Sequence, residues 1–388
     1  MEFEHQSLSL IEDWRVKTLS KTLHVFPAST FLGPFIDFIN SNFPPEDHLF
    51  YVMGDNSKYQ DISNHTNVIT ALKSDRKMRT ARRLIREIKS CEKVIIHGLF
   101  SLKLIVLLNA YLLISSRSRR PKMFWRIWGG DLYNNFLYPP SGRLKSLKKI
   151  RRTILLQPKK RLLRHLYGII SPVKGDYDFT VSKYKTNAKY FKYGNYAVYE
   201  PEYFEEIKKT EHPTDVPTIL LGNSASQTND HYEAIDLLKS LREYRDFRVL
   251  CPLSYGDNKY GEKVIEYGKD KLGESFEPIL NYIAESEYIS LLDSVDIAIM
   301  NHKRQQALGN IAILIRLGKK VYLRKQNPVY KHYIDMGAKV FSIDSISKDN
   351  PEKFFEFDKE TSEGNKKAAF SYNSKENVVK SWRDVFDS

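Results

Sequence analysis

The chain has 388 residues, a formal net charge of +14 at pH 7, and 41% hydrophobic and 13% aromatic residues. This length exceeds what one ordinary hydrophobic core serves, so two domains are expected, and the apolar content excludes a disordered chain. The two cysteines, Cys91 and Cys251, lie far apart in the sequence. They argue against a disulfide framework and a structural zinc site, and they suit a reducing cytoplasm.

The start of the chain, MEFEHQSLSL, carries acidic residues and lacks the basic stretch and apolar run of a secretory signal. The longest apolar run, residues 104–114, is about half of the roughly 20 residues that a membrane-spanning helix needs. We predict that this run forms a buried core helix. The protein is therefore expected to be soluble or peripherally attached to a membrane.

The charge is distributed unevenly along the chain. Residues 1–210 contain 36 basic and 19 acidic residues, whereas residues 211–388 contain 25 and 28. The segment 117–164 has 15 basic residues and a single acid, Asp131. Such a segment attracts anionic lipid head groups or nucleic acid, at roughly 1 kcal/mol per basic residue near a charged membrane. The alternative interpretation of this segment is a solvated face with scattered counter-ions. The difference in charge between the two halves of the chain favours two domains with different partners.

Apolar patterning predicts alternating strands and helices in the first half of the chain. Expected strands lie at 22–26, 48–54, 92–98, 122–131 (running into a glycine turn), 167–172 and 190–194. Expected helices lie at 31–41, 75–89, 100–115 and 141–166. A domain boundary is expected near 200–216, where proline and charge replace the periodic pattern.

The alternation restarts beyond this boundary. Expected strands, with their loops, lie at 217–225, 246–256, 276–283, 295–303 and 319–327. Expected helices lie at 231–241, 260–272, 286–294 and 309–318, and the polar tail is expected to end in a helix near 375–386. Strands separated by helices at this spacing indicate an α/β fold with parallel, doubly wound sheets. We therefore predict two Rossmann-like domains, residues 1–205 and 206–388, with a ligand in the cleft between them.

The segment 220–231, LLGNSASQTNDH, has the composition of a phosphate-binding loop. Gly222 allows close backbone approach, and the hydroxyl groups of Ser224, Ser226 and Thr228 can donate hydrogen bonds. The helix that follows presents free N–H groups and the positive end of its dipole. The alternative is an ordinary loop whose helix N-cap is Thr228, Asn229 or Asp230.

A second candidate anion site lies in the segment 300–323. A strand ends at a polar cluster, and Gly309 and Asn310 then start an apolar helix at 310–317. Basic character beside this helix start is expected from His302, Lys303 and Arg304. The alternative is a structural glycine at a tight turn, with the basic residues on a solvated loop.

The segment 122–133, KMFWRIWGGDLY, contains the isolated acid Asp131 after a strand and two glycines. This carboxylate is either a structural ion-pair hub or a general base that deprotonates an acceptor hydroxyl. His97, at the end of the strand 92–98, either bonds an acceptor hydroxyl or satisfies a buried backbone group. Nearby aromatic residues either stack on sugar rings or pack in the core: Trp125, Trp128 and Tyr133.

The sequence has no Asp-x-Asp motif and no His-x-x-x-His or similar ligand cluster. No metal and no other cofactor is therefore expected. Helix N-termini and basic side chains would then stabilise a leaving diphosphate.

These segments, in this order, resemble glycosyltransferase family 56. Its bacterial members add 4-acetamido-4,6-dideoxygalactose (N-acetylfucosamine) from dTDP to the lipid-linked intermediate of enterobacterial common antigen. The likeness covers roughly residues 22–345, and its most specific parts are the Trp-Gly-Gly-Asp-Leu-Tyr and Gly-Asn-Ser segments. The matching stretches are 95–100, 124–133, 220–235, 251–256 and 304–310.

The resemblance implies a GT-B fold, peripheral attachment at the cytoplasmic face of the bacterial inner membrane, and a polyprenyl-diphosphate-linked glycan as acceptor. It implies that 1–205 binds acceptor and faces the membrane, near His97, Trp128, Asp131 and Tyr133. The range 206–388 would bind the dTDP-sugar through Gly222, Asn223, Ser224, Ser226, Thr228, Gln305, Gln306, Gly309 and Asn310. Ala307 and Asn310 depart from the family pattern, so a related 4-acetamido-dideoxyhexose of O-antigen or another surface glycan is an alternative donor.

The hypothesis is sugar transfer from dTDP to a lipid-linked hydroxyl, with Asp131 as the base, or His97 if Asp131 is structural. It involves no nucleic acid, and the sequence does not decide between inversion and retention. One alternative is a non-catalytic nucleic-acid-binding protein that uses 117–164. Another is a nucleotide-sugar epimerase or dehydrogenase, although the dinucleotide fingerprint is missing.

Overall fold

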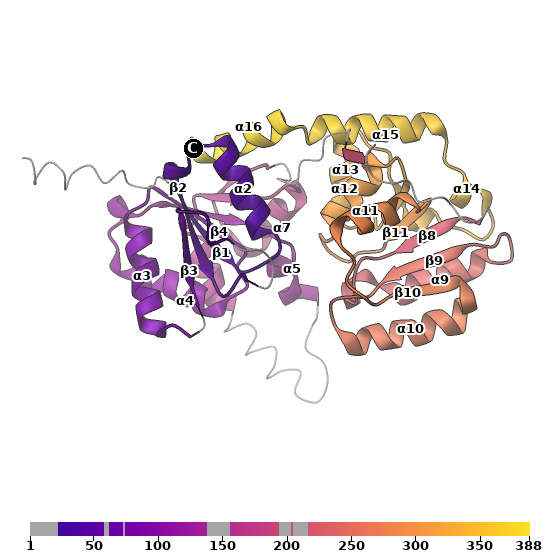
Figure 1. The fold of residues 1–388 in the computed structure, drawn as a ribbon, viewed down its shortest axis with the longest axis horizontal. Helices are drawn as coiled ribbons and strands as arrows, with labels where there is room; N and C mark the ends of the chain where they lie inside the picture. Colours follow the sequence, from indigo (N-terminus) through magenta and orange to yellow (C-terminus); the bar gives the residue numbers. More distant parts are fainter. Residues whose placement is uncertain (1–21, 58–61, 73, 138–155, 194–202, 205–215) are drawn as a thin grey trace, which may run out of the picture.

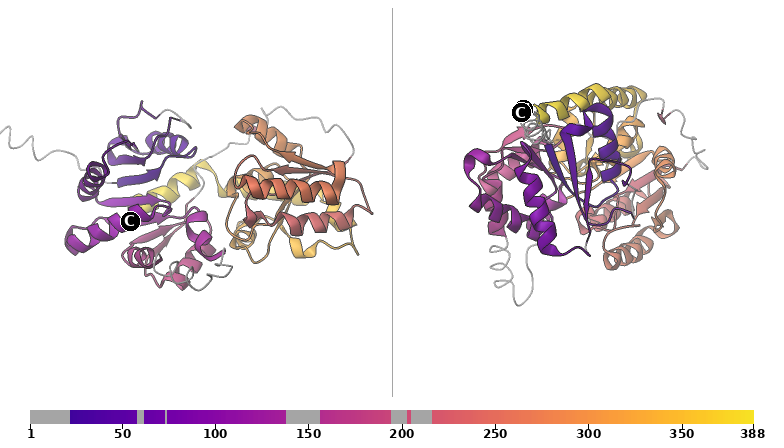
Figure 2. Two further views of the ribbon diagram at one scale, coloured as in Figure 1. Left: turned by 90° about the horizontal axis from the view of Figure 1, so that it is seen from below. Right: turned by 60° about the vertical axis from the view of Figure 1, so that its left-hand side comes forward.

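The computed structural model describes residues 22–57, 62–72, 74–137, 156–193, 203–204 and 216–388 (Figure 1). These residues form two parallel β-sheets that lie side by side, each with helices against it (Figures 1 and 2). The predicted α/β fold with doubly wound parallel sheets is confirmed. Each sheet has apolar clusters on both faces, which is why its strands are continuous apolar runs.

The first sheet has seven parallel strands in the order β3-β2-β1-β4-β5-β6-β7. The strands are β1 (Thr22–Pro27), β2 (His48–Met53), β3 (Val68–Ala71), β4 (Lys93–His97), β5 (Lys122–Arg126), β6 (Gly168–Ile170) and β7 (Lys189–Phe191). The helices that accompany it are α2 (Leu32–Asn42), α3 (Lys77–Lys89), α4 (Leu102–Ile114), α5 (Gly130–Leu137) and α7 (Lys174–Tyr184). Residues 156–163 are also helical.

The second sheet has six parallel strands in the order β10-β9-β8-β11-β12-β13. The strands are β8 (Thr218–Leu221), β9 (Arg248–Pro252), β10 (Phe276–Ile279), β11 (Ile297–Met300), β12 (Lys320–Leu323) and β13 (Phe341–Ser342). Its helices are α9 (His231–Leu241), α10 (Asn258–Leu272), α11 (Glu285–Asp293), α12 (Leu308–Arg316), α13 (Pro328–Asp335) and α14 (Glu352–Phe355).

The last two helices connect the two sheets. Helix α15 (Lys359–Tyr372) packs against α12 of the second unit, whereas α16 (Lys375–Phe386) lies over the first unit (Figure 1). Val378, Trp382 and Val385 of α16 are fully buried in an apolar cluster of the first sheet. Residues 375–386 therefore pack with the first unit, although they fall within the predicted second range 206–388.

The expected strands and most expected helices are confirmed, with ends that shift by a few residues. The segment 122–131 is a strand only to Arg126, because the glycines that follow turn the chain into α5. Residues 141–155 of the predicted basic helix lie outside the described residues, as does most of the expected boundary at 200–216. The sequence interpretation missed β3, α5, α7, α13, β13, α14 and α15.

The prediction that residues 104–114 form a buried helix is wrong for one face of α4. Val106, Leu113 and Ile114 are 50%, 62% and 75% exposed. The opposite face of α4 is buried in the core of the first sheet, at Leu104, Leu108 and other positions. A helix that is apolar all round has a buried face and also an exposed apolar face when only one side meets the sheet.

Candidate active site

A cleft of about 340 Å³ lies between the two units and is lined by residues of both. The first unit contributes Phe31, Arg126, Ile127, Trp128, Pro172 and Tyr193. The second unit contributes Asn223, Tyr255 and residues 305–310, together with side chains of α12, α13 and α15. A larger open hollow of about 540 Å³ lies beside it, at the starts of α9 and α10. We call the first of these the cleft.

The order of the strands explains why the cleft lies here. In each sheet the order reverses once, between β1 and β4 in the first and between β8 and β11 in the second. The loops that leave neighbouring strands at such a point diverge to opposite faces and open a crevice, where α/β proteins bind ligands. The predicted donor segments are the loops after β8 and β11, so both lie at the switch point of the second sheet.

Side-chain hydrogen bonds join these two loops directly. The Gln306 Nε2 donates to Asn223 Oδ1 at 2.8 Å, and the Thr228 hydroxyl donates to Gln306 Oε1 at 2.5 Å. The Ser226 and Thr228 hydroxyls are 2.8 Å apart, and Asn223 Nδ2 donates to the Tyr255 hydroxyl at 2.6 Å. The structure therefore brings Asn223, Ser226, Thr228 and Gln306 together.

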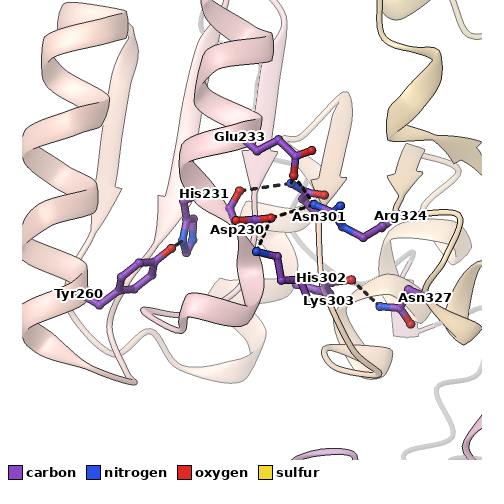
Figure 3. A network of polar contacts seen from close by, with 9 residues as sticks. All are labelled: Asp230, His231, Glu233, Tyr260, Asn301, His302, Lys303, Arg324 and Asn327. Atoms are coloured by element: carbon purple, nitrogen blue, oxygen red, sulfur yellow. Dashed lines mark hydrogen bonds and ion pairs between the residues drawn. The ribbon is translucent and has the colours of Figure 1, made fainter. Parts of the chain in front are cut away.

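A network of ion pairs and hydrogen bonds connects the same two loops to α9 and to the end of β12 (Figure 3). The Asp230 carboxylate lies 2.8 Å from Lys303 Nζ and 3.0 Å from the Arg324 guanidinium. Glu233 accepts a hydrogen bond from Asn301 Nδ2 at 2.9 Å and also pairs with Arg324. These contacts connect α9 to the loop after β11 and to the end of β12, and so they help to hold the loops in place.

The expectation that His302 adds positive charge is wrong. This side chain is 1% exposed, and its Nε2 lies 2.9 Å from Asn229 Oδ1. Burial, with a contribution from Arg304, lowers the pKa of His302 to about 3, so the imidazole is neutral at physiological pH. The charge of Lys303 is already paired with Asp230.

The N-terminus of α12 opens into the cleft. Ala307 has a left-handed backbone conformation (φ 55°), and Leu308, Gly309 and Asn310 follow as the first helical turn. A Cβ atom at Gly309 would meet nothing within 4 Å, so this glycine faces open space. The first N–H groups of a helix have no partner within the helix and favour anions. Asn310 is fixed at the edge by a 2.9 Å hydrogen bond from its Nδ2 to the Tyr288 hydroxyl.

Gly222 and Ser224 serve the shape of the loop. Gly222 has φ +68°, and a Cβ there would lie 2.8 Å from Asn229 Oδ1 and 3.0 Å from His231 Nε2. The Ser224 hydroxyl is buried and accepts a 3.2 Å hydrogen bond from Asn229 Nδ2. Neither residue lines the cleft, whereas the predicted donor residues Asn223, Gln305, Gln306, Gly309 and Asn310 do.

The two units touch at Gly129, which has φ +84°. A Cβ at this position would lie 1.8 Å from Gln305 Oε1 and 2.4 Å from the Gln305 backbone oxygen. Only a glycine permits this approach. The contact brings the turn after β5 against the loop after β11, and so it joins two segments that are 176 positions apart in the sequence.

Asp131 is a hydrogen-bond acceptor for the turn that precedes it. Its Oδ2 accepts from Leu99 N at 2.9 Å and from Trp125 Nε1 at 2.7 Å, and its Oδ1 accepts from Trp128 N at 3.0 Å. The residue is 4% exposed and is not among those that line the cleft. The carboxylate thus fixes the loop between β4 and α4 and the turn that carries Trp128.

The other predicted acceptor residues occupy different places. Trp128 lines the cleft beside Phe31, with ring centroids 5.3 Å apart. Tyr133 points into the core and donates a 2.8 Å hydrogen bond to Asp176, so it is not placed to stack on a sugar. His97 is fully buried and lies inside the first sheet, behind the cleft wall.

The sequence interpretation missed several residues that line the cleft, above all Arg126, Tyr193 and Tyr255. One signal was available for Arg126, since a charged residue inside an apolar run (MFWRIW) needs a reason to be there. Tyr193 and Tyr255 carry no such signal, because tyrosine is common in cores and on surfaces alike.

Two Rossmann-type units that face each other across a cleft form the architecture known as GT-B. Residues 25–385 match the sequence model of a family described as 4-alpha-L-fucosyltransferase, glycosyl transferase group 56. The match spans nearly the whole chain, and the protein belongs to this family.

Solved structures of glycosyltransferases share the fold at low sequence identity. A glycosyltransferase from Rickettsia africae is 15% identical with a TM-score of 0.66, over 95% of this chain and 98% of that one. HepE from Anabaena, solved with UDP and glucose, is 12% identical with a TM-score of 0.65, over 95% and 99%. The trehalose 6-phosphate synthase of Burkholderia multivorans is 8% identical with a TM-score of 0.63, over 95% and 96%.

Within the described ranges, no helix has both the length and the apolar character to cross a membrane. In the same part of the chain, no three His, Cys, Asp or Glu side chains are grouped as metal ligands.

Proposed function

We propose that this glycosyltransferase moves a 4-acetamido-4,6-dideoxyhexose, N-acetylfucosamine or a close relative, from dTDP to a polyprenyl-diphosphate-linked glycan. Such a reaction belongs to the synthesis of a bacterial surface polysaccharide, enterobacterial common antigen or O-antigen, at the cytoplasmic face of the inner membrane. The observation that carries the donor half of this proposal is the hydrogen-bonded pair of loops at the switch point of the second sheet. Membership of family 56 supports the choice of sugar.

In this proposal residues 206–374 bind the nucleotide sugar, and residues 1–205 bind the acceptor. The donor diphosphate lies at the N-terminus of α12, where free N–H groups and the helix dipole stabilise the charge that develops on the leaving group. Gln306 and Asn223 hold the two loops in register, and Asn310 borders the site. The open space at Gly309 is where a phosphate oxygen approaches the backbone.

The geometry changes the role that we assign to Asp131. All of its observed hydrogen bonds come from N–H groups of its own unit, and its carboxylate does not face the cleft. We infer that Asp131 positions the Trp128–Gly130 turn against Gln305. His97 is enclosed as well, and it acts on the cleft only through its neighbours.

Purified protein and detergent-solubilised lipid acceptor test the function directly. We expect transfer of the sugar from dTDP-N-acetylfucosamine and thermal stabilisation by dTDP that exceeds that by UDP or GDP, since binding to the folded state raises its stability. Stabilisation by UDP or GDP alone would contradict the dTDP assignment. Transfer of the dideoxyhexose to a soluble sugar, with no transfer to the lipid-linked acceptor, would contradict the acceptor assignment.

The Gly309→Ala substitution tests the donor site without disturbing the fold. A methyl group there meets no protein atom, and alanine favours a helix more than glycine does, so the variant should fold with an equal or slightly higher melting temperature. If a phosphate occupies the space, dTDP binding should weaken on the order of tenfold, about 1.4 kcal/mol. Calorimetric titration with dTDP measures this.

Gly364→Ala is the matched control for Gly309→Ala. Gly364 is also helical and exposed, and a Cβ there likewise meets nothing within 4 Å. It lies in α15 but is not among the residues that line the cleft, so this variant should bind dTDP as the unaltered protein does. Equal affinity of both variants would place the phosphate elsewhere.

The membrane contact in this proposal is the exposed face of α4. Leu102, Val106, Leu113 and Ile114 are all at least 41% exposed and form one stripe of the helix, which is too short to span a bilayer. Exposed basic residues, Arg117 and Arg119 among them, follow directly. An apolar stripe beside positive charge is complementary to a surface of anionic lipids.

Leu113→Glu should weaken co-sedimentation with vesicles of phosphatidylglycerol and phosphatidylcholine several-fold, because the carboxylate resists insertion and is repelled by anionic head groups. Ile334→Glu is the control, since Ile334 is 43% exposed on α13 of the second unit. Both variants should retain the melting temperature. Equal binding of both to the vesicles would remove α4 from the membrane contact.

A further inference from the structure

A chain of hydrogen bonds runs through the interior of the first sheet to the cleft. Arg126 Nη1 lies 3.3 Å from His97 Nδ1, His97 Nε2 lies 3.0 Å from His24 Nδ1, and His24 Nε2 lies 3.1 Å from His48 Nδ1. The four residues come from the adjacent strands β5, β4, β1 and β2. All are buried, and Arg126, at the end of β5, is the one that lines the cleft.

The arginine determines where every proton of this chain lies. A guanidinium only donates, so His97 Nδ1 must carry the lone pair and His97 Nε2 the proton. His97 then donates to His24, and His24 donates to His48. All three imidazoles are therefore neutral and hold the same tautomer, with their acceptor nitrogens turned toward the arginine.

The surroundings are consistent with three neutral rings. Burial is the main cause that lowers the pKa of His24 and His97 well below the ordinary value and that of His48 to about 4. Trp382 and Phe386 of α16 pack against the imidazole rings. Phe386 contacts His48 edge-to-face, with ring centroids 4.6 Å apart, and Trp382 is stacked on His97. Aligned dipoles in such a chain strengthen one another and stabilise the cation at its end.

Arg126 also contacts two aromatic residues at the wall of the cleft. Besides His97 it donates to the Tyr193 hydroxyl at 3.1 Å, and its guanidinium lies 4.8 Å from the Tyr193 ring and 5.3 Å from the Trp128 ring. Imidazole, phenol and aromatic faces can orient a guanidinium toward a ligand. An arginine held in this way can form short, charge-assisted hydrogen bonds to phosphate oxygens.

We propose that Arg126 binds the diphosphate of a substrate from the first-unit side of the cleft, with His97, His24 and His48 as positioning residues. Arg126 and the N-terminus of α12 line the same cleft from opposite units. The inference rests on the proposed function for the identity of the substrates, which supply two diphosphates. One is on the nucleotide donor and the other on the lipid acceptor.

Arg126→Gln and Arg126→Lys test the site in two arms. In the donor arm, calorimetry compares dTDP with thymidine; in the acceptor arm, the KM is measured for a glycan on a short prenyl diphosphate. We expect a loss of about 10- to 100-fold in one arm, the scale of a charged hydrogen bond, with thymidine binding unchanged. The arm in which binding weakens shows whether Arg126 contacts the donor or the acceptor diphosphate. The Arg126→Lys variant should retain part of the binding that Arg126→Gln loses.

No change in either arm, with both variants folded, would overturn the proposal. Denaturant unfolding is measured in parallel, and Arg126→Lys keeps the test valid if Arg126→Gln does not fold. If the unaltered protein binds dTDP but transfers no sugar from it, the proposed function fails, whereas the Arg126 binding arm still gives its own result.

Two substitutions of His97 distinguish a positioning role from a packing role. His97→Gln keeps one acceptor and one donor, whereas His97→Leu removes both. If the chain positions Arg126, His97→Leu should raise the dissociation constant or KM of the same diphosphate several-fold, with kcat changed less, and His97→Gln should restore most of it. Equal effects of Leu and Gln on KM, at equal stability, would contradict the positioning role.

Discussion

Gly129→Ala should reduce sugar transfer by two orders of magnitude or more and lower the stability of the protein. The new methyl would lie 1.8 Å from Gln305 Oε1 and 2.4 Å from its backbone oxygen, so one of the two loops must move. Overpacking of this kind costs about 1–3 kcal/mol, and the left-handed backbone adds about 1–2 kcal/mol for any residue with a Cβ. A displacement of about 1 Å at an active site can cost about 100-fold in rate.

Gly337→Ala is the control that separates these two costs. Gly337 has φ +90°, close to the +84° of Gly129, but its Cβ would lie 3.9 Å from the nearest atom, Ala368 Cβ. It should lose stability through the backbone alone and keep its transfer rate. Transfer assays and denaturant unfolding of both variants decide the matter, and a Gly129→Ala enzyme as active as Gly337→Ala would show that the Gln305 contact is dispensable.

Asp131→Asn is the second substitution with a large expected effect. The two carboxylate oxygens accept hydrogen bonds from three N–H groups. In asparagine an NH₂ group replaces one of these oxygens, and it would lie against an N–H group with no acceptor between them. Leaving buried donors unsatisfied costs about 1–3 kcal/mol. We expect the melting temperature to fall and transfer to drop at least tenfold, with a raised KM for the acceptor, because Trp128 is no longer fixed.

A positioning role and a general-base role for Asp131 give different results. A base predicts a loss of kcat at unchanged stability and unchanged KM, which would contradict the arrangement inferred here. Asp257→Asn is the control for stability, since Asp257 accepts from the Lys259 and Tyr260 N–H groups as an exposed helix cap. Asparagine caps helices as well as aspartate does, so this variant should unfold like the unaltered protein.

Most strands were predictable because they are buried on both faces. Residues 94–96 and 219–221, for instance, are fully buried apolar runs, and such runs between helical stretches have few other interpretations. The loops after β8 and β11 were predictable too, since glycine, hydroxyl and amide residues directly after a buried strand mark its carboxyl end. What these loops bind remains the proposal, and their direct contact is the finding of the structure.

The missed elements and residues have physical causes as well. Helix α7 (Lys174–Tyr184) has no amphipathic pattern, because Asp176 and Thr180 are buried on it beside Tyr184. The polar composition of α15 concealed a helix whose exposed side is larger than its buried side. Asp131 was singled out as either a structural hub or a general base, because a carboxylate that accepts three N–H groups looks the same in sequence as one that faces a substrate.

The sequence alone determined that the protein consists of parallel α/β units, and it located the loops that follow their central strands. Those features depend on local apolar runs and on residues that are neighbours in the chain. Tertiary structure decided which polar groups meet: His24, His48 and His97 become one chain, Gly129 touches Gln305, and α16 returns to the first sheet. Contacts between residues tens to hundreds of positions apart depend on the order of the strands, and that order is set by the packing of the whole molecule.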